Sequence, residues 1–522
     1  MNSPPDQKSA AGIKVGEPNF EKVVDIQLAV TADKPPDLHN GNNPDIDGED
    51  KSDSVETSKR FETYLDQRGR ATCVIRDHGN PYAVPIRSKT FEHILRREAK
   101  VREVRLRKAD LAELIDELEA DAEVEGEIIH IFHRVAPIPN GIEIDRGCED
   151  QTRYRITAKG FELITEGSEA TFSRTITMLP LATPADKGDL SIIDKYLNLE
   201  EDDIVMFKGL VSYINAHPKV PSTNYPITAM IGGQGTGKSF QSKLFQSLID
   251  PSTVGVQSMP KNEKDFSITL QNTHLLCADN TRKLRESRAD LCCISTSGGA
   301  VSSRALYTND DQHVIHLHGA LLLNGIHNFI DQPDMAERSV ILHPLPINPE
   351  QRKSEAELMA DLEKDMPVIL RGLYDYIAKI FAQPEVRSKR PERLIELSDW
   401  YARMEKVDGV DEGTYQSIYS ANLRQAQLNS LFENALAVAI IQFAESLKNP
   451  WKGTPSDLLD ELNQEVSRAT QRSPYWPQNS IAFSKRILVL QTGLKSQGIY
   501  VTKGRRKERQ ILLTTDKLEE EY

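Results

Sequence analysis

The chain has 522 residues, a formal net charge of −14, 39% hydrophobic residues and 27% charged residues. This length exceeds what one hydrophobic core supports, so we expect several domains. The composition is typical of a soluble globular protein, and neither a membrane-spanning stretch nor a secretory signal is recognisable. The acidic balance argues against a protein that coats nucleic acid uniformly, although local basic surfaces stay open.

The five cysteines show no C-x-x-C spacing. This usage suits a reducing compartment better than a disulfide scaffold or a zinc site, and we expect a cytoplasmic protein.

The first part of the chain predicts a tail and a small domain. Residues 1–58 are rich in Pro, Asp, Asn, Gly and Ser, which predicts a disordered, mostly acidic tail. Residues 59–184 combine strand and helix patterns and predict a small α+β domain, in which Glu143 and Asp145 are expected on the polar face of a strand. A basic run in this domain either touches nucleic acid or forms a solvated helix face, the second being favoured. It consists of Lys100, Arg102, Arg105, Arg107 and Lys108.

A phosphate-binding motif lies at the centre of the chain. Residues 227–231 predict a buried strand, and apolar residues at helical spacing follow from Phe240. The sequence between them fits G-x-x-x-x-G-K-[ST] at every fixed position, so we predict a P-loop. It consists of Gly232, Gly233, Gln234, Gly235, Thr236, Gly237, Lys238 and Ser239.

The chemistry of a P-loop explains these residue types. Glycines let backbone N–H groups turn inward around phosphate oxygens, and the helix N-terminus adds partial positive charge. Lys238 is then expected to reach the β- and γ-phosphates of ATP, and Ser239 to ligate Mg²⁺. The alternative is a glycine-rich turn without a ligand.

A second apolar segment, residues 273–278, ends in Asp279. A strand that delivers an aspartate downstream of a P-loop predicts a Walker B motif, whose carboxylate holds Mg²⁺ beside the phosphates. The alternative is any buried strand that ends in a turn.

Two further strands are predicted after it. Residues 320–323 form an apolar strand that ends in Asn324, which we expect to orient the attacking water. Arg338 precedes the strand at 340–343 and is a candidate arginine finger from a neighbouring subunit, or else part of a surface salt bridge.

The order of these motifs resembles the superfamily-3 helicases, compact AAA+-related ATPases of viruses, plasmids and prophages, and among them the primase-helicase-like ATPases of phages and integrated elements. Residues 299–308, 323–326 and 333–342 carry the resemblance, which covers residues 186–346 well and the rest loosely. It implies a hexameric ring with a hairpin in its channel, where Arg304 and Tyr307 would grip single-stranded nucleic acid.

The chain departs from this pattern at one position. Many such ATPases carry a second acidic residue after the Walker B aspartate, and this chain has Asn280. Hydrolysis then depends on Asp279 itself, is slow, or needs a partner.

The carboxyl-terminal third predicts two helical regions. Residues 350–428 predict a helical lid, and residues 429–522 predict three helices followed by a hairpin, the pattern of a winged helix. Lys485 and Arg486 lie near the start of the expected groove helix. A winged helix that contacts proteins is the alternative to one that binds nucleic acid. The expected wing-tip cations are Arg505, Arg506, Lys507 and Arg509.

The sequence therefore predicts an α/β P-loop, AAA+-like ATPase core, residues 185–349, with an α+β amino-terminal domain, a helical lid and a winged helix. The leading functional hypothesis is an ATP- and Mg²⁺-dependent DNA helicase or translocase that replicates a mobile element as a ring. One alternative is a nucleotide-gated DNA-binding or regulatory ATPase without unwinding activity, including a defence-related one, and Asn280 favours it. A P-loop small-molecule kinase ranks last, and DNA versus RNA stays open.

Overall fold

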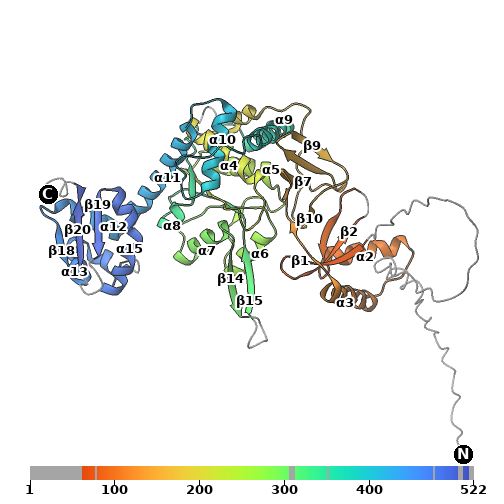
Figure 1. Cartoon of the computed structure of the whole chain (residues 1–522), viewed down its shortest axis with the longest axis horizontal. Helices are drawn as coiled ribbons and strands as arrows, with labels where there is room; N and C mark the ends of the chain where they lie inside the picture. The colour runs from red at the N-terminus through yellow and green to blue at the C-terminus, as the bar shows by residue number, and fades with distance from the viewer. Residues whose placement is uncertain are drawn as a thin grey trace, which may run out of the picture. The chain divides into compact units, whose positions relative to one another are not determined.

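The computed structural model describes residues 61–76, 79–304, 312–348, 350, 352–473, 476–503 and 510–516. The chain divides into two compact units, Met1–Ile131 and Phe132–Tyr522, which are considered separately (Figure 1). Within the described ranges no helix is long and apolar enough to cross a membrane. The predicted tail lies outside these ranges.

The amino-terminal unit packs two helices against a small sheet. Its strands β1, β2 and β3 are antiparallel, and β4 joins β1 in parallel. Both helices contribute to one core with Phe61 and Cys73 of the sheet, through Phe91 and Leu111 among others. The elements are β1 (Phe61–Asp66), β2 (Ala71–Ile75), β3 (Tyr82–Pro85), α2 (Lys89–Val101), α3 (Lys108–Glu125) and β4 (Ile128–Ile129).

The second unit begins with an antiparallel four-stranded sheet, ordered β6-β7-β8-β9. Its Tyr154 and Phe161 pack their rings 5.4 and 5.5 Å from that of Tyr374 on helix α9 (Glu355–Phe381). This shared core explains why the unit boundary falls at residue 131, inside the range 59–184 predicted as one domain. The elements here are β5 (Ile131–Phe132), β6 (Val135–Ile138), β7 (Gly141–Asp145), β8 (Arg153–Thr157), β9 (Gly160–Ile164) and β10 (Thr171–Ser173).

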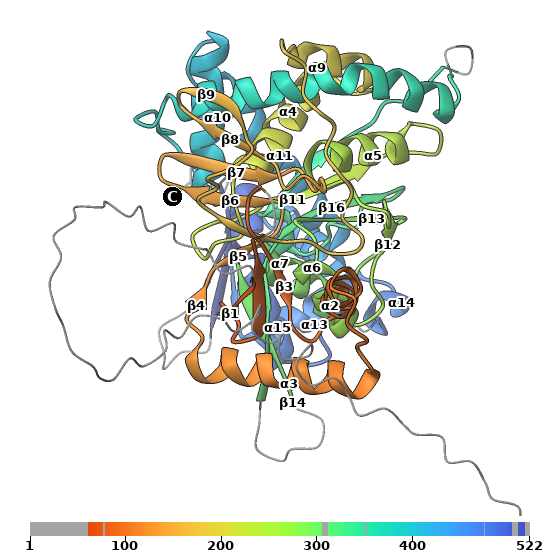
Figure 2. The same cartoon turned by 90° about the vertical axis from the view of Figure 1, so that its right-hand side faces the viewer.

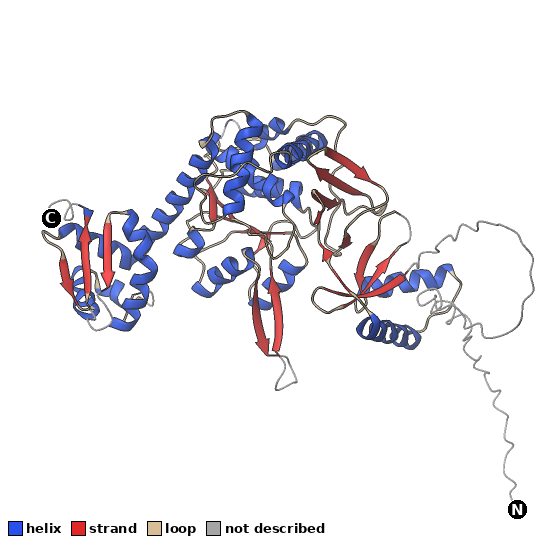
Figure 3. Cartoon of the chain, viewed as in Figure 1, coloured by secondary structure: helices blue, strands red, loops and turns tan. Residues whose placement is uncertain are grey.

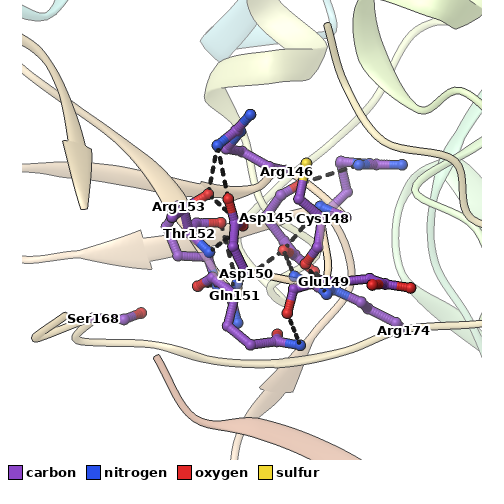
Figure 4. A network of polar contacts seen from close by, with 12 residues as sticks. Asp145, Arg146, Cys148, Glu149, Asp150, Gln151, Thr152, Arg153, Ser168 and Arg174 are labelled. Carbon is purple, nitrogen blue, oxygen red and sulfur yellow. Dashed lines mark hydrogen bonds and ion pairs between the residues drawn. The ribbon is translucent and has the colours of Figure 1, made fainter. Parts of the chain in front are cut away.

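Glu143 and Asp145 lie on one side of β7, as the alternation of the strand predicts, but that side is buried rather than solvated. Arg155 pairs with Glu143 at 2.6 Å, while Arg153 and Arg174 pair with Asp145 at 3.1 and 2.6 Å (Figure 4). Burial alone would raise the pKa of Asp145, yet the hydrogen bond from Arg174 and the two nearby cations hold it below its ordinary value. Both carboxylates therefore serve as structural anions.

The central sheet is wholly parallel, with the strand order β12-β13-β16-β11-β17. The strands predicted at 227–231, 273–278 and 320–323 are confirmed as β11, β13 and β16. The one predicted at 340–343 is β17, shifted by one residue. The strands are β11 (Ile227–Ile231), β12 (Gln257–Ser258), β13 (Leu275–Asp279), β16 (Ala320–Gly325) and β17 (Ser339–Leu342).

Helices bury both faces of this sheet, which accounts for its continuously apolar strands. Met230 and Leu322 share a core with Phe207 of α4 and Phe245 of α5. Ala229 and other alternate strand residues pack with α6 and α7 on the opposite face (Figure 2). The surrounding elements are η1 (Leu190–Tyr196), α4 (Glu201–Ala216), α5 (Lys238–Ile249), α6 (Glu263–Gln271), α7 (Glu286–Thr296) and α8 (Pro333–Ala336).

Between α7 and β16 an antiparallel hairpin, β14 (Gly299–Arg304) and β15 (Gln312–Leu317), projects away from the sheet (Figure 1). The register pairs Gly299 with Leu317 and Arg304 with Gln312. The predicted hairpin is therefore present between β13 and β16.

The rest of the unit is mainly helical (Figure 3). Helix α10 packs on α4, where the Trp400 indole N–H donates to Ser212 Oγ at 3.0 Å. The last residues form a separate core, in which Ile440, Leu462 and Ile487 meet the antiparallel sheet β18-β20-β19. The elements are α10 (Ile395–Asp408), α11 (Thr414–Glu433), α12 (Ala435–Ser446), β18 (Trp451–Gly453), α13 (Pro455–Glu465), α14 (Arg468–Gln471), α15 (Ser480–Ser496), β19 (Ile499–Lys503) and β20 (Ile511–Thr515).

One buried ion pair joins the β6–β9 sheet to the parallel sheet. Arg134 is fully buried and donates from Nε to Asp250 Oδ1 at 2.9 Å, and from its terminal nitrogens to the carbonyls of Asp145 and Leu179. Asp250 follows the last residue of α5, and its other oxygen accepts the backbone N–H of His274 at 2.7 Å, directly before β13.

We predict that Arg134→Met destabilises the protein by about 3–5 kcal/mol, because it leaves the Asp250 carboxylate buried without its cation. Lys389→Met is the matched control, since its partner Glu412 and Lys389 itself are 61% and 79% exposed, and it should cost less than about 1 kcal/mol. Denaturant unfolding of the full chain measures both. Equal midpoints for the two variants would contradict a structural role for the buried pair.

Candidate functional site

The predicted phosphate loop connects β11 to α5 and has the backbone that its glycines allow. Gly235 and Gly237 have φ angles of 74° and 79°, in the left-handed region that glycine adopts at no steric cost. Gly237 is also the residue before the first turn of α5. The unpaired N–H groups at the start of this helix and its positive dipole end therefore lie at the loop.

Lys238 lies against the same loop. Its Nζ donates to the carbonyls of Gly232 and Gly233 at 2.7 and 2.5 Å, and to Thr236 Oγ1 at 3.3 Å. Burial lowers the pKa of Lys238, and the negative charge of Asp279 partly offsets this effect. The two residues predicted to act on the phosphates and on Mg²⁺ are thus close enough to interact electrostatically.

Asp279 ends β13, two strands away from β11 in the same parallel sheet. The next residue, Asn280, has a φ of 53°, and its backbone N–H donates to Asp279 Oδ1 at 2.7 Å. Asparagine tolerates this left-handed conformation better than glutamate does. The backbone of the turn therefore disfavours a glutamate at position 280.

Asn324 lies at the end of β16, between β13 and β11, and is buried. Its Oδ1 accepts the N–H of Asn280 at 3.2 Å, and its Nδ2 donates to Ser242 Oγ of α5 at 2.9 Å. The carbonyl of Asn324 also accepts the N–H of Thr281 at 2.7 Å. The side chain that was predicted to orient water thus holds the turn after Asp279 and ties it to α5.

Sequence reasoning missed a segment that covers the outer side of the loop. We call residues 343–354, between β17 and α9, the strap, of which 349 and 351 lie outside the described part. Cβ atoms built on Gly232 and Gly237 would lie 3.1 Å from the Pro344 carbonyl oxygen and 3.3 Å from Ile347 Cδ1. The strap is therefore packed directly against the loop.

Two polar side chains accompany the strap. Asn198 Nδ2 donates to the carbonyls of Leu345 and Thr236 at 2.5 and 3.3 Å, bridging strap and loop. A Cβ on Gly235 would lie 2.9 Å from a terminal guanidinium nitrogen of Arg352. The glycine at 235 therefore makes room for an arginine beside the phosphate loop. No motif or spacing in the sequence points to either residue.

Arg338 lies at the amino-terminal ends of the parallel strands, opposite the end that carries the loop. It directly precedes β17, whereas the loop follows the carboxyl end of β11, which runs parallel to β17. The length of the strand separates them by about 15 Å. Within the chain Arg338 pairs with Asp334 at 3.2 Å, and Arg393 pairs with Asp334 and Glu337 at 2.9 and 2.5 Å. Arg338 therefore does not contact the loop of its own chain.

The predicted nucleic-acid residues are only partly described. Arg304 ends β14, and its side chain lies outside the described part, as does Tyr307. On α15 Lys485 is exposed, and Arg486 is partly buried. Three apolar residues share the exposed surface of α15 with Lys485, namely Ile481, Leu488 and Val489 at 72%, 52% and 61% exposure. The predicted wing cations Arg505, Arg506, Lys507 and Arg509 lie outside the described residues.

Solved structures of the C-terminal region of NrS-1 are similar to this chain at low identity. Three of them share 13%, 11% and 10% identity, each with a TM-score of 0.35. They cover 87–88% of this chain and 96% of their own. No match was found among curated proteins.

Two family models match the chain in succession. Residues 201–425, which contain the loop, Asp279, Asn324 and Arg338, match the actinomycete integrative conjugative element replication protein. Residues 436–521 match the AICE RepA C-terminal domain. The two matches together cover more than half of the chain, and they identify it as a replication protein of a mobile element.

Proposed function

We propose that the chain is an ATP-dependent DNA helicase or translocase with a P-loop, AAA+-like core. The observation that carries the proposal is the convergence of the glycine-rich loop, Lys238 and Asp279 at the carboxyl edge of one parallel sheet. Ligands of open parallel sheets bind at this edge. The strand order, with the loop after β11, an interior strand between β16 and β17, supports a nucleotide-binding core.

The residues present fit ATP and Mg²⁺. The backbone N–H groups of the loop and Lys238 would hold the β- and γ-phosphates, while Ser239 and Asp279 would hold Mg²⁺, which neutralises charge that develops on the transferred phosphoryl group. Asn324 would keep Asp279 in place through the turn that it binds. Arg352 would add a positive charge to the phosphates from the same chain.

The proposal extends to the assembly and to DNA. Subunits would form a ring, which brings Arg338 of one subunit to the phosphates bound by its neighbour. The β14–β15 hairpin, with Arg304 and Tyr307, would contact single-stranded DNA in the channel. The carboxyl-terminal helices and the β18-β20-β19 sheet would act as a winged helix that anchors duplex DNA.

The five cysteines are free thiols, which supports a cytoplasmic setting.

A second candidate is a nucleotide-gated DNA-binding or regulatory ATPase that does not unwind DNA. Asn280 favours it, because no second carboxylate follows Asp279 to polarise water. The exposed apolar residues of α15 also suit a protein contact.

ATP turnover tests the proposed roles of Lys238 and Asp279. Lys238→Ala should lower ATP hydrolysis by about 100-fold or more and weaken ATP binding, because it removes a cation from the developing phosphate charge. Asp279→Asn should keep much of the nucleotide binding and lose Mg²⁺-dependent hydrolysis. Steady-state phosphate release and strand separation of forked DNA measure both steps. Undiminished turnover in Lys238→Ala would refute the site, and turnover without strand separation in the parent protein would favour the second candidate.

Arg352 offers a sharper test of the geometry of the loop. Arg352→Ala should weaken nucleotide binding about tenfold or more, because charge-assisted hydrogen bonds to phosphate contribute about 1.5–3 kcal/mol. Lys353→Ala is the matched control, since its Nζ lies 3.9 Å from Asp361 and its charge change is the same. Fluorescent-nucleotide titrations compare the two. Equal affinities would show that Arg352 contacts no phosphate.

Arg338 should act on a neighbouring subunit. Arg338→Ala and Lys238→Ala proteins, each inactive alone, should recover part of the ATP turnover when mixed, because an intact Lys238 can then face an intact Arg338. Turnover is measured against the mixing ratio. A fully active monomer, or no recovery in rings shown to exchange subunits, would contradict this arrangement.

A further inference from the structure

The amino-terminal unit contains a solvent-open cleft of about 380 Å³ where α2 ends and the chain turns toward α3. Three cations line it, Arg96, Lys100 and Arg105, together with one carboxylate, Glu103. The remaining lining residues are apolar. The basic run that the sequence predicted as a solvated face therefore contributes part of its charge to a concave surface.

The end of α2 positions these cations. Arg96 and Lys100 lie one turn apart, so they share a face of the helix. Glu103 has a φ of 58°, and the chain turns back as the N–H of Val104 donates to the Ala99 carbonyl at 2.8 Å. Val104 and Leu106 pack against the core of the unit, which leaves the intervening Arg105 at the cleft.

Two other cations of the run form ion pairs with neighbouring carboxylates. Arg102 pairs with Glu98 at 2.7 Å, and Arg107 pairs with Asp110 at 3.2 Å. Across the described ranges no ion pair involves Arg96, Lys100 or Arg105. The carbonyls at the end of α2 accept backbone N–H groups, including those of residues 102 and 103, so the helix end is already capped.

The cleft thus gathers three cations against one carboxylate in a chain whose net charge is −14. Like charges one helical turn apart destabilise a helix, so an anion bound between Arg96 and Lys100 would stabilise α2. The cleft is open rather than enclosed, which suits a polymer that passes through it better than a small ligand, whose sites bury most of its surface.

We propose that this cleft binds the phosphodiester backbone of DNA. It is a third nucleic-acid contact, separate in sequence from the β14–β15 hairpin and from the carboxyl-terminal region. It goes beyond the proposed ATPase function, because phosphate contacts here need no nucleotide. Glu103 limits the net charge and keeps the contact readily reversible.

The test compares two triple variants of the full chain. The cleft variant is Arg96→Gln, Lys100→Gln and Arg105→Gln. The control variant is Lys89→Gln, Arg97→Gln and Lys108→Gln, which removes the same charge from exposed positions on α2 and α3 outside the cleft. Binding of a single-stranded and of a duplex oligonucleotide is measured by fluorescence anisotropy between about 50 and 200 mM salt.

In the cleft variant the slope of log affinity against log salt should fall by about two to three, since each lost phosphate contact removes about 0.9 for duplex and 0.7 for single strands. The control should keep the parent's slope within about 0.5. The oligonucleotide, single-stranded or duplex, whose salt slope decreases more in the cleft variant is the form of DNA that the cleft holds. Equal slopes in the two variants would overturn the proposal.

Two further readouts keep the result clear. Matched unfolding midpoints for both variants exclude a folding defect. Inorganic phosphate at constant ionic strength should not displace DNA from the parent protein, and full displacement at low millimolar phosphate would instead assign the cleft to a small anion. No ATP is present, so the outcome is independent of the Lys238 test.

Discussion

The carboxylate of Asp250 fixes the two elements on which the proposed nucleotide site depends. It follows the end of α5, receives Arg134 on one oxygen, and receives the backbone N–H that precedes β13 on the other. The helix that begins with Lys238 and the strand that ends in Asp279 are thereby joined at their far ends. The surrounding apolar core is non-directional, whereas a fully buried charge pair with saturated hydrogen bonds has a single geometry.

Asn324 makes a similar link at the opposite ends of α5 and β13, close to Lys238 and Asp279. It links β16 to α5 through Ser242 and to the turn after β13 through the N–H of Asn280. The strand and helix are therefore held by polar contacts both beside the site and one strand length away from it. The position of Asp279 relative to the loop therefore depends on these hydrogen bonds as well as on packing.

Local sequence patterns predicted the parts of the site that follow the chain. The loop motif, β11, β13 and the asparagine after Leu323 each lie in one short segment, and the structure places their elements in one sheet. Arg352 and Asn198 carry no such pattern, because each reaches the loop from a different part of the chain. The burial of Glu143 and Asp145 was not predicted for a similar reason. Arg174, which pairs with Asp145, lies outside strands β7 and β8. The role of the nucleic-acid residues beyond the described ranges stays a prediction.

Helix α9 has a consequence for motion. Its first turn is tied to α5 by the ion pair of Glu355 and Lys243 at 2.5 Å, and its carboxyl-terminal half carries Tyr374 into the core of the β6–β9 sheet. At 27 residues it is about 40 Å long and acts as a rod between these two attachments. A displacement of the strap must either turn this rod as one body or bend it near Pro367, where a backbone hydrogen bond is missing. Motion of the strap is thus coupled through α9 to the β6–β9 sheet.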